Sequence, residues 1–339
     1  MEIYTDEFYK SQRDGSRRSA QAIVPIVLRL IKPRSVIDVG CGLGTWLSVF
    51  QELGINDVLG LDGSYVDRSM LQIAAERFLA VDVAKPIRID RQFELAVCLE
   101  VAEHLPKECA RTLVESLTKL SPVVLFSAAI PFQGGTSHVN EQWPDYWASY
   151  FRDNDYETVD CIRNKVWQDD AVEWWYAQNT LVFCRKDHLA GNPLLQEEFK
   201  KTHPAQLSLV HPKRYLEMIQ LELTARELAN LLPKDGAVIL VDQDQLRDSL
   251  ALGNRALPFL EQGGRYWGPP PDAVTAIREL ERMHQAGADM IVFLWPAFWW
   301  LDYYDAFRRH LVSNFHCMLQ NDRMVAFDLK SKAAVLKMT

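Results

Sequence analysis

The chain has 339 residues, more than one domain usually holds, and 48% of them are hydrophobic, which is enough for two buried cores. Its formal net charge of −8 disfavours a nucleic-acid partner, because such partners need lysine and arginine to neutralise phosphates. No apolar run is long enough to span a membrane, and the N-terminal segment lacks the apolar stretch of a signal peptide. We therefore predict a globular, cytoplasmic protein with no membrane partner.

The six cysteines are scattered through the chain without C-x-x-C spacing. This pattern favours reduced thiols over a disulfide framework or a zinc site. We expect most of them to be small core residues.

From residue 35 to residue 183, short apolar runs alternate with helical patterns, which is typical of β-α units that form a parallel sheet with helices on both faces. Strands are expected at residues 35–39, 57–61, 77–81, 95–99, 123–127, 157–162 and 180–184. Helices are expected at residues 16–31, 45–53, 107–120 and 144–153. Residues 1–187 are thus predicted to form a doubly wound, seven-stranded α/β domain.

Residues 188–211 contain glycine and prolines but no sustained strand pattern, so we expect a linker there. A second α/β pattern covers residues 212–339 and resembles the α/β appendages of bacterial methyltransferases and glycosyltransferases. Its expected helices lie at residues 212–232, 271–286 and 303–313, and its strands at residues 237–241, 290–294 and 324–329. This smaller domain has no glycine-rich nucleotide loop and no metal-ligand spacing, so its role stays open.

The sharpest motif is an apolar strand that runs into the turn Gly40-Cys41-Gly42-Leu43-Gly44 and then into a helix. Glycines let the backbone approach a ligand closely, at the edge where such sheets bind nucleotides. The G-x-G-x-G spacing differs by one residue from the G-x-G-x-x-G of dinucleotide-binding proteins. By itself the turn fits either a nucleotide-type cofactor or a tight connection.

Carboxylates at the ends of the next strands strengthen the cofactor interpretation. Asp62 follows the second strand, where an acidic side chain can accept both ribose hydroxyls. Asp82 ends the third strand, and its carboxylate with the backbone N–H of Val83 suits an adenine. Glu100 ends the fourth strand. A solvated acid at a strand end is the alternative for each, but the glycine turn and three acids in the right order make coincidence a poor explanation.

The D-V-G-C-G-L-G turn and the L-E-V-A-E-H-L segment resemble class I S-adenosylmethionine-dependent methyltransferases, and the resemblance covers residues 1–187. It implies S-adenosylmethionine as the cofactor and a Rossmann-like sheet. Tyr4, Phe8 and Tyr9 resemble the N-terminal segment that closes over the site in such enzymes. The cofactor-binding residues that follow from the resemblance are Asp38, Gly40, Cys41, Gly42, Gly44, Asp62, Asp82, Val83, Leu99, Glu100 and Tyr9.

The loop at residues 131–143 carries the candidate general base, His138. Class I enzymes commonly place acceptor-binding elements after the fifth strand, and histidine is the side chain best suited to remove a hydroxyl proton near neutral pH. A hydrogen-bonded core histidine is the alternative. The other predicted catalytic residue is Glu100, and the predicted substrate contacts are Asn140, Gln142, Trp143 and Trp174.

A metal site competes with this interpretation. Glu100, Glu103, His104 and His138 form an E-x-x-E-H pattern with a distant histidine, which resembles the metal site of the small-RNA 2′-O-methyltransferases. A divalent ion there could lower the pKa of an acceptor hydroxyl. The same E-x-x-E-H-L segment is frequent in metal-independent class I enzymes, so our main prediction has no metal.

Tryptophans cluster in the rest of this domain, interleaved with acidic residues; they are Trp143, Trp147, Trp167, Trp174 and Trp175. Flat aromatic faces beside carboxylates suit a sugar, although the same side chains could simply close the edge of the sheet. The segment around Glu173 and the loop at residues 134–147 resemble bacterial methyltransferases of glycan and natural-product assembly. We therefore predict O-methylation of a sugar or glycosylated small molecule.

The second domain has an aromatic run at residues 295–304, which we interpret as a plug between strand and helix rather than a docking surface or carbohydrate platform. Residues 263–271 should form an exposed loop that positions the acceptor or joins two copies as a homodimer. Two other function classes stay open. One is a nicotinamide-dependent oxidoreductase, which the G-x-G-x-G spacing and Glu100 disfavour, and the other is a non-catalytic cofactor-binding scaffold.

Overall fold

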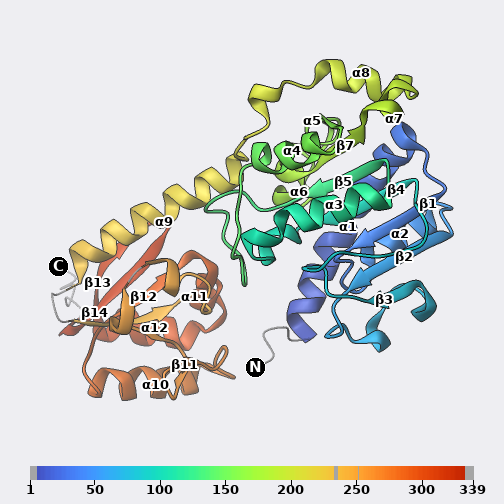
Figure 1. Ribbon diagram of the computed structural model, residues 1–339. Helices are drawn as coiled ribbons and strands as arrows, with labels where there is room; N and C mark the ends of the chain where they lie inside the picture. The colour runs from blue at the N-terminus through green and yellow to red at the C-terminus, as the bar shows by residue number, and fades with distance from the viewer. Residues whose placement is uncertain (1–5, 233–235, 251, 333–339) are drawn as a thin grey trace. The chain divides into compact units, whose positions relative to one another are not determined.

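The computed structural model describes residues 6–232, 236–250 and 252–332. The chain divides into two compact units, Met1–Arg214 and Tyr215–Thr339 (Figure 1). The division falls within the first turn of helix α9 (Pro212–Leu231). Residues 188–211, which we expected to be a linker, belong to the first unit and are largely helical. The functional boundary between the domains stays a prediction.

The first unit is a seven-stranded sheet covered by helices (Figure 1). Its strands are β1 (Ser35–Val39), β2 (Asp57–Asp62), β3 (Phe78–Ala80), β4 (Leu95–Leu99), β5 (Val123–Ser127), β6 (Tyr156–Val159) and β7 (Leu181–Arg185). Its helices are α1 (Asp6–Ile31), α2 (Thr45–Glu52), α3 (Ala110–Leu120), α4 (Pro144–Asp153), α5 (Arg163–Val166), α6 (Trp174–Asn179), α7 (Lys186–Ala190) and α8 (Pro193–Lys201). The predicted doubly wound α/β fold is confirmed.

The strand order is β3-β2-β1-β4-β5-β7-β6. Strands β3 to β5 are parallel, but β7 runs antiparallel to both β5 and β6. Our expectation of a wholly parallel sheet was therefore wrong at β7. A fully buried apolar strand reads the same in either direction, so its pattern could not reveal which way it runs.

The two faces of this sheet bury separate apolar clusters. Alternate residues of a strand point to opposite faces, so Val36 joins the cluster under α1 and α2 while Ile37 joins the cluster under α3 and α4. The faces are apolar throughout the central strands. Polar groups can therefore gather only at the strand ends, where the predicted site residues lie.

The segment at residues 204–207 is fixed to the first unit by Arg163, a buried residue of α5. Its guanidinium donates to the carbonyl oxygens of Leu207 at 2.7 Å and Gln206 at 3.3 Å, and it is paired with Asp160 at 2.6 Å. These contacts, together with the buried Leu195 of α8, explain why the expected linker folds against the sheet.

The second unit has a five-stranded sheet of order β13-β14-β12-β8-β9 and a separate hairpin, β10–β11. Its strands are β8 (Ala237–Val241), β9 (Ala256–Pro258), β10 (Glu261–Gln262), β11 (Arg265–Tyr266), β12 (Ala288–Leu294), β13 (Phe315–Gln320) and β14 (Met324–Lys332). Its helices are α9, α10 (Ala273–Gln285), α11 (Trp299–Tyr303) and α12 (Asp305–Asn314). The predicted smaller α/β domain is confirmed, although β9 and β13, both edge strands, carried too little apolar pattern to be predicted.

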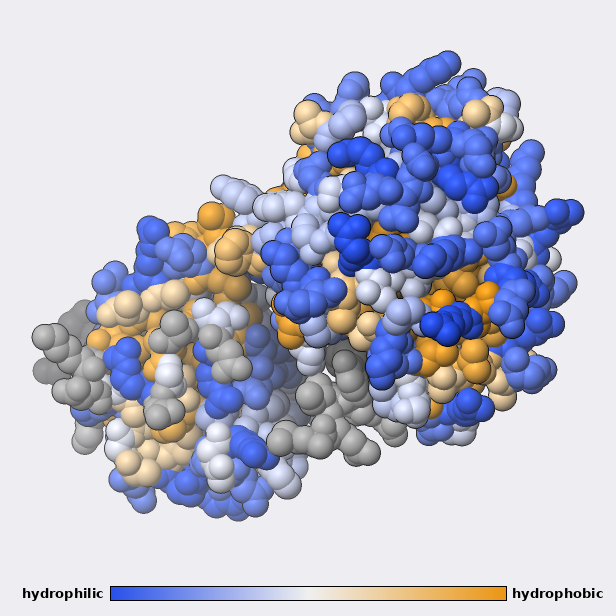
Figure 2. Space-filling model, viewed as in Figure 1, coloured by the Kyte–Doolittle hydropathy of each residue, from blue (hydrophilic) through white to orange (hydrophobic). Residues whose placement is uncertain are grey.

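The aromatic run of the second unit is mainly a plug. Trp300 is fully buried and its ring lies 6.1 Å from that of Phe259, while Trp299 and Tyr303 stay exposed beside it. Apolar side chains are also exposed along α9, and Figure 2 shows them on the surface of this helix. Within the described residues, no helix is long and apolar enough to cross a membrane.

Candidate active site

The glycine-rich turn after β1 has a left-handed backbone that packs closely on its neighbours. Gly40, Gly42 and Gly44 have φ angles of 82°, 52° and 80°, which residues with a side chain rarely adopt. A Cβ atom on Gly40 would lie 2.3 Å from Val101 Cγ2, and one on Gly44 would lie 2.9 Å from Ile73 Cγ1. A Cβ atom on Gly42 would meet nothing within 4 Å. The turn is therefore held by packing on one side and open to a ligand at Gly42.

Asp62, at the end of β2, is held against this turn. Its Oδ2 accepts a hydrogen bond from Gly42 N at 2.7 Å, and its Oδ1 accepts one from Gly63 N at 2.6 Å. Oδ1 also accepts a hydrogen bond from the hydroxyl of Tyr65, a residue that is 71% exposed. Asp62 is therefore held at the glycine turn, bonded to Gly42 on one side and to Tyr65 on the other.

Two further predicted cofactor residues are buried at the same point. Asp38 of β1 is 3% exposed, and burial, followed by repulsion from Asp62, raises the pKa of its carboxyl to about 8. Cys41 is also buried in the core, and burial raises the pKa of its thiol. The Cys41 side chain thus points into the core, and only the backbone of this residue belongs to the turn.

Glu100 is the centre of a polar network at the end of β4. Its φ of 53° is unusual for a residue with a side chain, and its backbone N–H donates to Ser127 O at 3.1 Å. Its carboxylate accepts hydrogen bonds from Gln133 Nε2 and Asn179 Nδ2, both at 3.2 Å. Burial raises the pKa of this carboxyl, and the hydrogen bonds oppose that shift. The network joins β4, the loop after β5 and helix α6.

The predicted adenine contacts follow β3. Asp82 is exposed and pairs with Lys85 at 3.0 Å, and its carboxylate accepts a hydrogen bond from Ala84 N at 3.1 Å. The bond to Lys85, followed by that to Ala84, lowers the pKa of Asp82. Val83 is half-buried and Leu99 is buried, so both can offer apolar contact at this edge of the sheet.

Three predicted residues of the N-terminal segment cannot be placed in the site. Tyr4 lies outside the described residues. Phe8 and Tyr9 belong to α1, but their side chains also lie outside the described part of the structure. Closure by this segment stays a prediction.

The loop after β5 holds His138 in a fixed orientation. His138 Nδ1 lies 3.0 Å from Glu141 Oε1, which also accepts a hydrogen bond from Gly134 N at 2.7 Å. A Cβ atom on Gly135 would lie 2.4 Å from His138 Nε2, so this glycine makes room for the imidazole ring. Glu141 therefore orients His138 and is itself fixed by the backbone of the loop.

Glu103, His104 and His138 come together, with their potential ligand atoms all within 4.8 Å of one another. Glu103 is fully buried, and neither of its carboxylate oxygens has a hydrogen-bond partner among the described residues. Burial, followed by repulsion from Glu100, raises the pKa of Glu103 well above its ordinary value. The structure thus assembles three of the four predicted metal ligands, and Glu100 is instead bonded to amides.

The predicted substrate contacts fall into two groups. Asn140 is buried and its Oδ1 accepts a hydrogen bond from Gln142 Nε2 at 3.1 Å, and the neighbouring Trp143 is 40% exposed. Trp174 belongs to α6 and lines a pocket of about 300 Å³. Trp147 belongs to neither group, because it is 2% exposed and packs in the core.

The pocket at Trp174 is also lined by Trp167, Asp169, Asp170 and His211. The backbone N–H of His211 donates to the side-chain oxygen of Gln178 at 2.7 Å. Gln178 Nε2 in turn donates at 3.2 Å to Gln133 Oε1, within the Glu100 network. The expected linker therefore contributes His211 to this pocket, and hydrogen bonds link His211 to the residues around Glu100.

A family described as a methyltransferase domain matches residues 9–182, which is more than half of the chain. The chain belongs to this methyltransferase family. It is an S-adenosylmethionine-dependent methyltransferase of class I, with the predicted glycine turn at the carboxyl end of β1. No curated protein matches the sequence.

Several solved structures are similar to part of this methyltransferase. The magnesium protoporphyrin IX methyltransferase of Synechocystis is 19% identical over 52% of this chain and 87% of its own, with a TM-score of 0.39. An O-methyltransferase family protein from Burkholderia thailandensis is 13% identical over 54% of this chain and 60% of its own, with a TM-score of 0.41. DesVI of Streptomyces venezuelae is 17% identical over 53% of this chain and 96% of its own, with a TM-score of 0.40. These TM-scores are low, so membership rests on the family match.

The residues of this methyltransferase fit its cofactor. Gly42, with open space where a Cβ atom would lie, and Asp62, which bonds to its N–H, are the residues that would hold the methionine and ribose portions. Asp38 of β1 and Glu100 after β4 would lie beside them.

Several residues of the site were not predicted from the sequence. The amides of Gln133, Gln178 and Asn179 carry no motif, and Tyr65 gave no signal. Glu141 was the exception, since an acid three residues after a candidate base is a spacing that could have been noticed. The amides could not be found because they bond to residues far away in the sequence, such as Gln133 to Glu100 and Asn179 to Glu100.

Proposed function

We propose that this methyltransferase methylates a hydroxyl group of a sugar or of a glycosylated natural product, with His138 as the general base. The observation that carries the proposal is the pair of His138 Nδ1 and Glu141 Oε1 at 3.0 Å. A histidine oriented by a carboxylate is the usual arrangement for accepting a proton from a hydroxyl.

S-adenosylmethionine supplies an electrophilic methyl group, so the protein must mainly align and desolvate the two reactants. Glu141 accepts the Nδ1–H of His138, which leaves Nε2 as the nitrogen that takes the hydroxyl proton. The amides of Gln133 and Asn179 fix Glu100, which we propose as the acid that borders the cofactor. Asn140, Gln142 and Trp143 are the proposed acceptor contacts beside the base.

The sugar-like acceptor is supported by the pocket at Trp174. Its tryptophans can stack on the C–H face of a sugar while Asp169 and Asp170 accept hydroxyls. The hydrogen bonds from His211 through Gln178 to Gln133 fix one wall of this pocket against the strand-end site. We propose that the pocket holds the sugar of the acceptor.

The test is methyl transfer from radiolabelled S-adenosylmethionine to a panel of sugar, glycoside and amine acceptors. We expect hydroxyl acceptors to be methylated, and His138→Ala to lower kcat by about 100- to 10,000-fold without changing cofactor affinity. Glu141→Gln should lower kcat less than His138→Ala does, because the glutamine side-chain oxygen can still accept the Nδ1–H of His138. His203→Ala, at an exposed histidine of the same unit, is the matched control and should leave kcat unchanged. Transfer to amines alone, or an unchanged kcat in His138→Ala, would contradict the proposal.

Metal-assisted methylation, as in the 2′-O-methyltransferases, is the second candidate function. It is favoured by the cluster of Glu103, His104 and His138 and by the buried carboxylate of Glu103, which lacks hydrogen bonds among the described residues. One carboxylate with two imidazoles suits manganese, iron or zinc. Calorimetric titration with Mn²⁺ on the wild type and Glu103→Gln tests it. Saturable binding lost in the variant, with EDTA-sensitive turnover, supports a metal, and EDTA-resistant turnover excludes it.

The remaining predictions concern partners and location. A homodimer is supported by the exposed apolar residues of α9, which are Tyr215, Leu216, Met218, Ile219 and Leu223. Sedimentation velocity on the wild type and Leu216→Asp tests it, and a wild-type monomer would contradict it. A cytoplasmic location and the lack of a nucleic-acid partner stay predictions from composition.

A further inference from the structure

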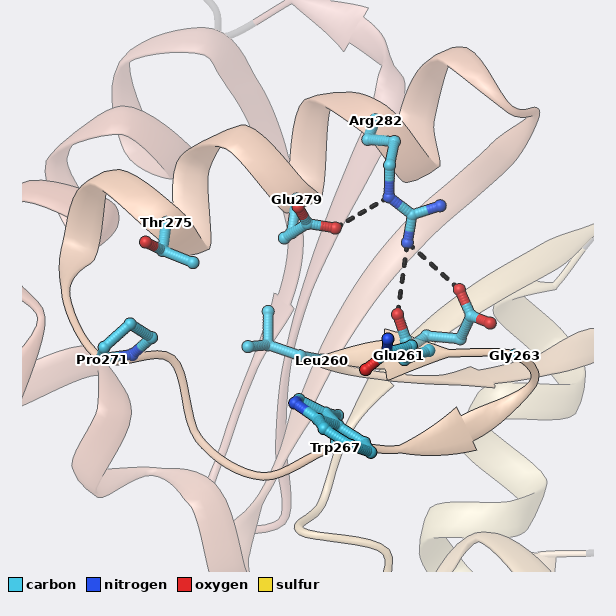
Figure 3. A pocket seen from close by; sticks show the side chains of 9 residues that line it. Leu260, Glu261, Gly263, Trp267, Pro271, Thr275, Glu279 and Arg282 are labelled. Carbon is cyan, nitrogen blue, oxygen red and sulfur yellow. Dashed lines mark hydrogen bonds and ion pairs between the residues drawn. The ribbon is translucent and has the colours of Figure 1, made fainter.

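The second unit contains a pocket of about 530 Å³ that the methyltransferase activity does not explain. Figure 3 shows it between α10 and the segment that follows the β10–β11 hairpin, with Leu260 between the two walls. Thr275 and Glu279 project from the helix, and Trp267 and Pro271 lie opposite them. This volume falls within the range of pockets that hold small organic ligands.

The pocket exposes a large flat aromatic surface. Trp267 is 71% exposed, although its backbone N–H donates to Leu260 O at 2.9 Å and thereby fixes its position. An exposed tryptophan on an ordered backbone forgoes burial of its ring, and tryptophan is the residue type most enriched at binding surfaces. Trp267 is the sole aromatic residue of the lining, so the pocket has one stacking face and not a cage for a quaternary ammonium group.

The opposite side of the pocket is polar and already ordered. Arg282 Nε donates to Glu279 Oε2 at 2.7 Å, and Arg282 Nη2 donates to Glu261 Oε2 at 3.1 Å (Figure 3). Glu261 also accepts a hydrogen bond from Gly264 N, which lowers the pKa of its carboxyl. The lining therefore carries two carboxyl groups and one guanidinium, and the excess of acidic over basic groups disfavours phosphate or carboxylate ligands.

The walls of the pocket are built by rigid segments. Gly263 and Gly264 have φ angles of 60° and 79°, as a two-residue hairpin turn requires. The hydroxyl of Tyr304, which is 5% exposed, donates to Pro270 O at 2.6 Å and holds the proline-rich segment before α10. A pocket that is ordered before its ligand arrives loses little entropy on binding.

We propose that this pocket binds a neutral sugar segment of a glycan. The C–H face of a sugar ring would stack on Trp267, while hydroxyl groups would donate to Glu261 and Glu279 and accept from Arg282. The proposal is independent of the proposed function, because binding here needs neither cofactor nor methyl transfer.

The test is titration of the full chain, without cofactor, by neutral trisaccharides of glucose, mannose, galactose or N-acetylglucosamine, followed by calorimetry and ligand-observed NMR. We expect saturable binding of at least one of them at concentrations up to about 10 mM. Trp267→Ala should weaken it about tenfold or more, and Trp267→Phe should keep most of it. The control Phe199→Ala, at an exposed aromatic residue outside the pocket lining, should bind as the wild type does.

A second part of the test compares acidic with neutral ligands. Two acidic ligands, trigalacturonic acid and UDP, should each bind more weakly than the neutral trisaccharides. Glu279→Gln should reduce the difference in affinity between the acidic and the neutral ligands. The proposal is overturned if no neutral trisaccharide binds, if binding is unaffected by Trp267→Ala, or if the acidic ligands are preferred. Binding that depends on Trp174 and not on Trp267 would support the acceptor pocket of the first unit and still overturn this one.

Discussion

Each of the two sheets has a buried aspartate at the end of a central strand, but the two carboxylates have different partners. Asp242 follows β8, is 1% exposed, and accepts hydrogen bonds from the backbone N–H groups of Asp244, Leu246 and Arg247 in its own loop. Asp62 accepts from Gly42, which belongs to the loop of another strand.

An acid at a strand end is a ligand candidate only when its partners reach beyond its own turn and leave room beside it. All the partners found for Asp242 are main-chain groups of one turn, so its role is to order that turn. Asp62 lies beside the open face of Gly42 and bonds to an exposed tyrosine hydroxyl. Substitutions at the two strand ends should therefore have different effects.

Asp62→Ala should raise the Kd for S-adenosylmethionine about 100-fold, because charge-assisted hydrogen bonds to ribose hydroxyls are lost. Isothermal titration calorimetry measures the change, with NAD as a ligand that should bind neither protein. A Kd within about threefold of the wild type would remove Asp62 from the cofactor site.

Asp242→Ala should lower the free energy of unfolding of the second unit by about 2–4 kcal/mol, since three backbone N–H groups lose their acceptor. Urea unfolding followed by circular dichroism measures this loss. Cofactor affinity is the control and should stay unchanged. If the variant instead lost cofactor affinity while remaining folded, Asp242 would have a role beyond its own turn.

Gly42→Ala and Gly263→Ala form a matched pair, because both positions have positive φ and open space where a Cβ atom would lie. Each should lose about 1 kcal/mol of stability through backbone strain. Only Gly42→Ala should also weaken binding of S-adenosylmethionine, as its methyl group would occupy the ligand side of the turn. Equal cofactor affinity in the two variants would place the ligand elsewhere.

The pKa of Asp38, raised to about 8 by burial, predicts a small pH effect. The folded protein holds this proton more tightly than the unfolded chain, so the contribution of Asp38 to stability falls as pH rises from about 4 to about 8. Ionised Asp38 should favour the positively charged cofactor, so affinity for S-adenosylmethionine relative to the uncharged thioether S-adenosylhomocysteine should rise through about pH 8. Calorimetry at a series of pH values measures the ratio, and Asp38→Asn should flatten it. A ratio that falls as pH rises would show that ionised Asp38 does not favour the positively charged cofactor.

Much of the fold could be read from periodicity. Strands β1, β4, β5 and β8 and helix α4 have the predicted bounds, because continuous apolar runs and helical spacing of apolar residues report burial directly. The periodicity of apolar residues does not report the direction of a strand, so the antiparallel orientation of β7 was not predicted. It is also weak in strands at the edge of a sheet, so β9 and β13 were missed.

Some residues of the candidate site could be predicted from the sequence and others could not. The glycine turn and Asp62 were predictable because strand order and turn chemistry are encoded within a few residues of each. The bond from Asn179 to Glu100 was not, since these residues are 79 positions apart. The place of His211 in the pocket lining was not predicted either. The proline-containing stretch before it has the pattern of a linker, and only its bonds to Arg163 show that it belongs to the first unit.

The family, the cofactor and the order of the strand-end residues follow from short segments of the chain, because strong local preferences carry them. The bonding partners of each carboxylate, the meeting of Glu103 and His104 with His138, and the pocket at Trp267 in the second unit follow only from the folded chain. These properties depend on side chains that meet across long stretches of chain. A hydrogen bond or a cavity wall is defined by distance in space, and distance along the chain does not report it.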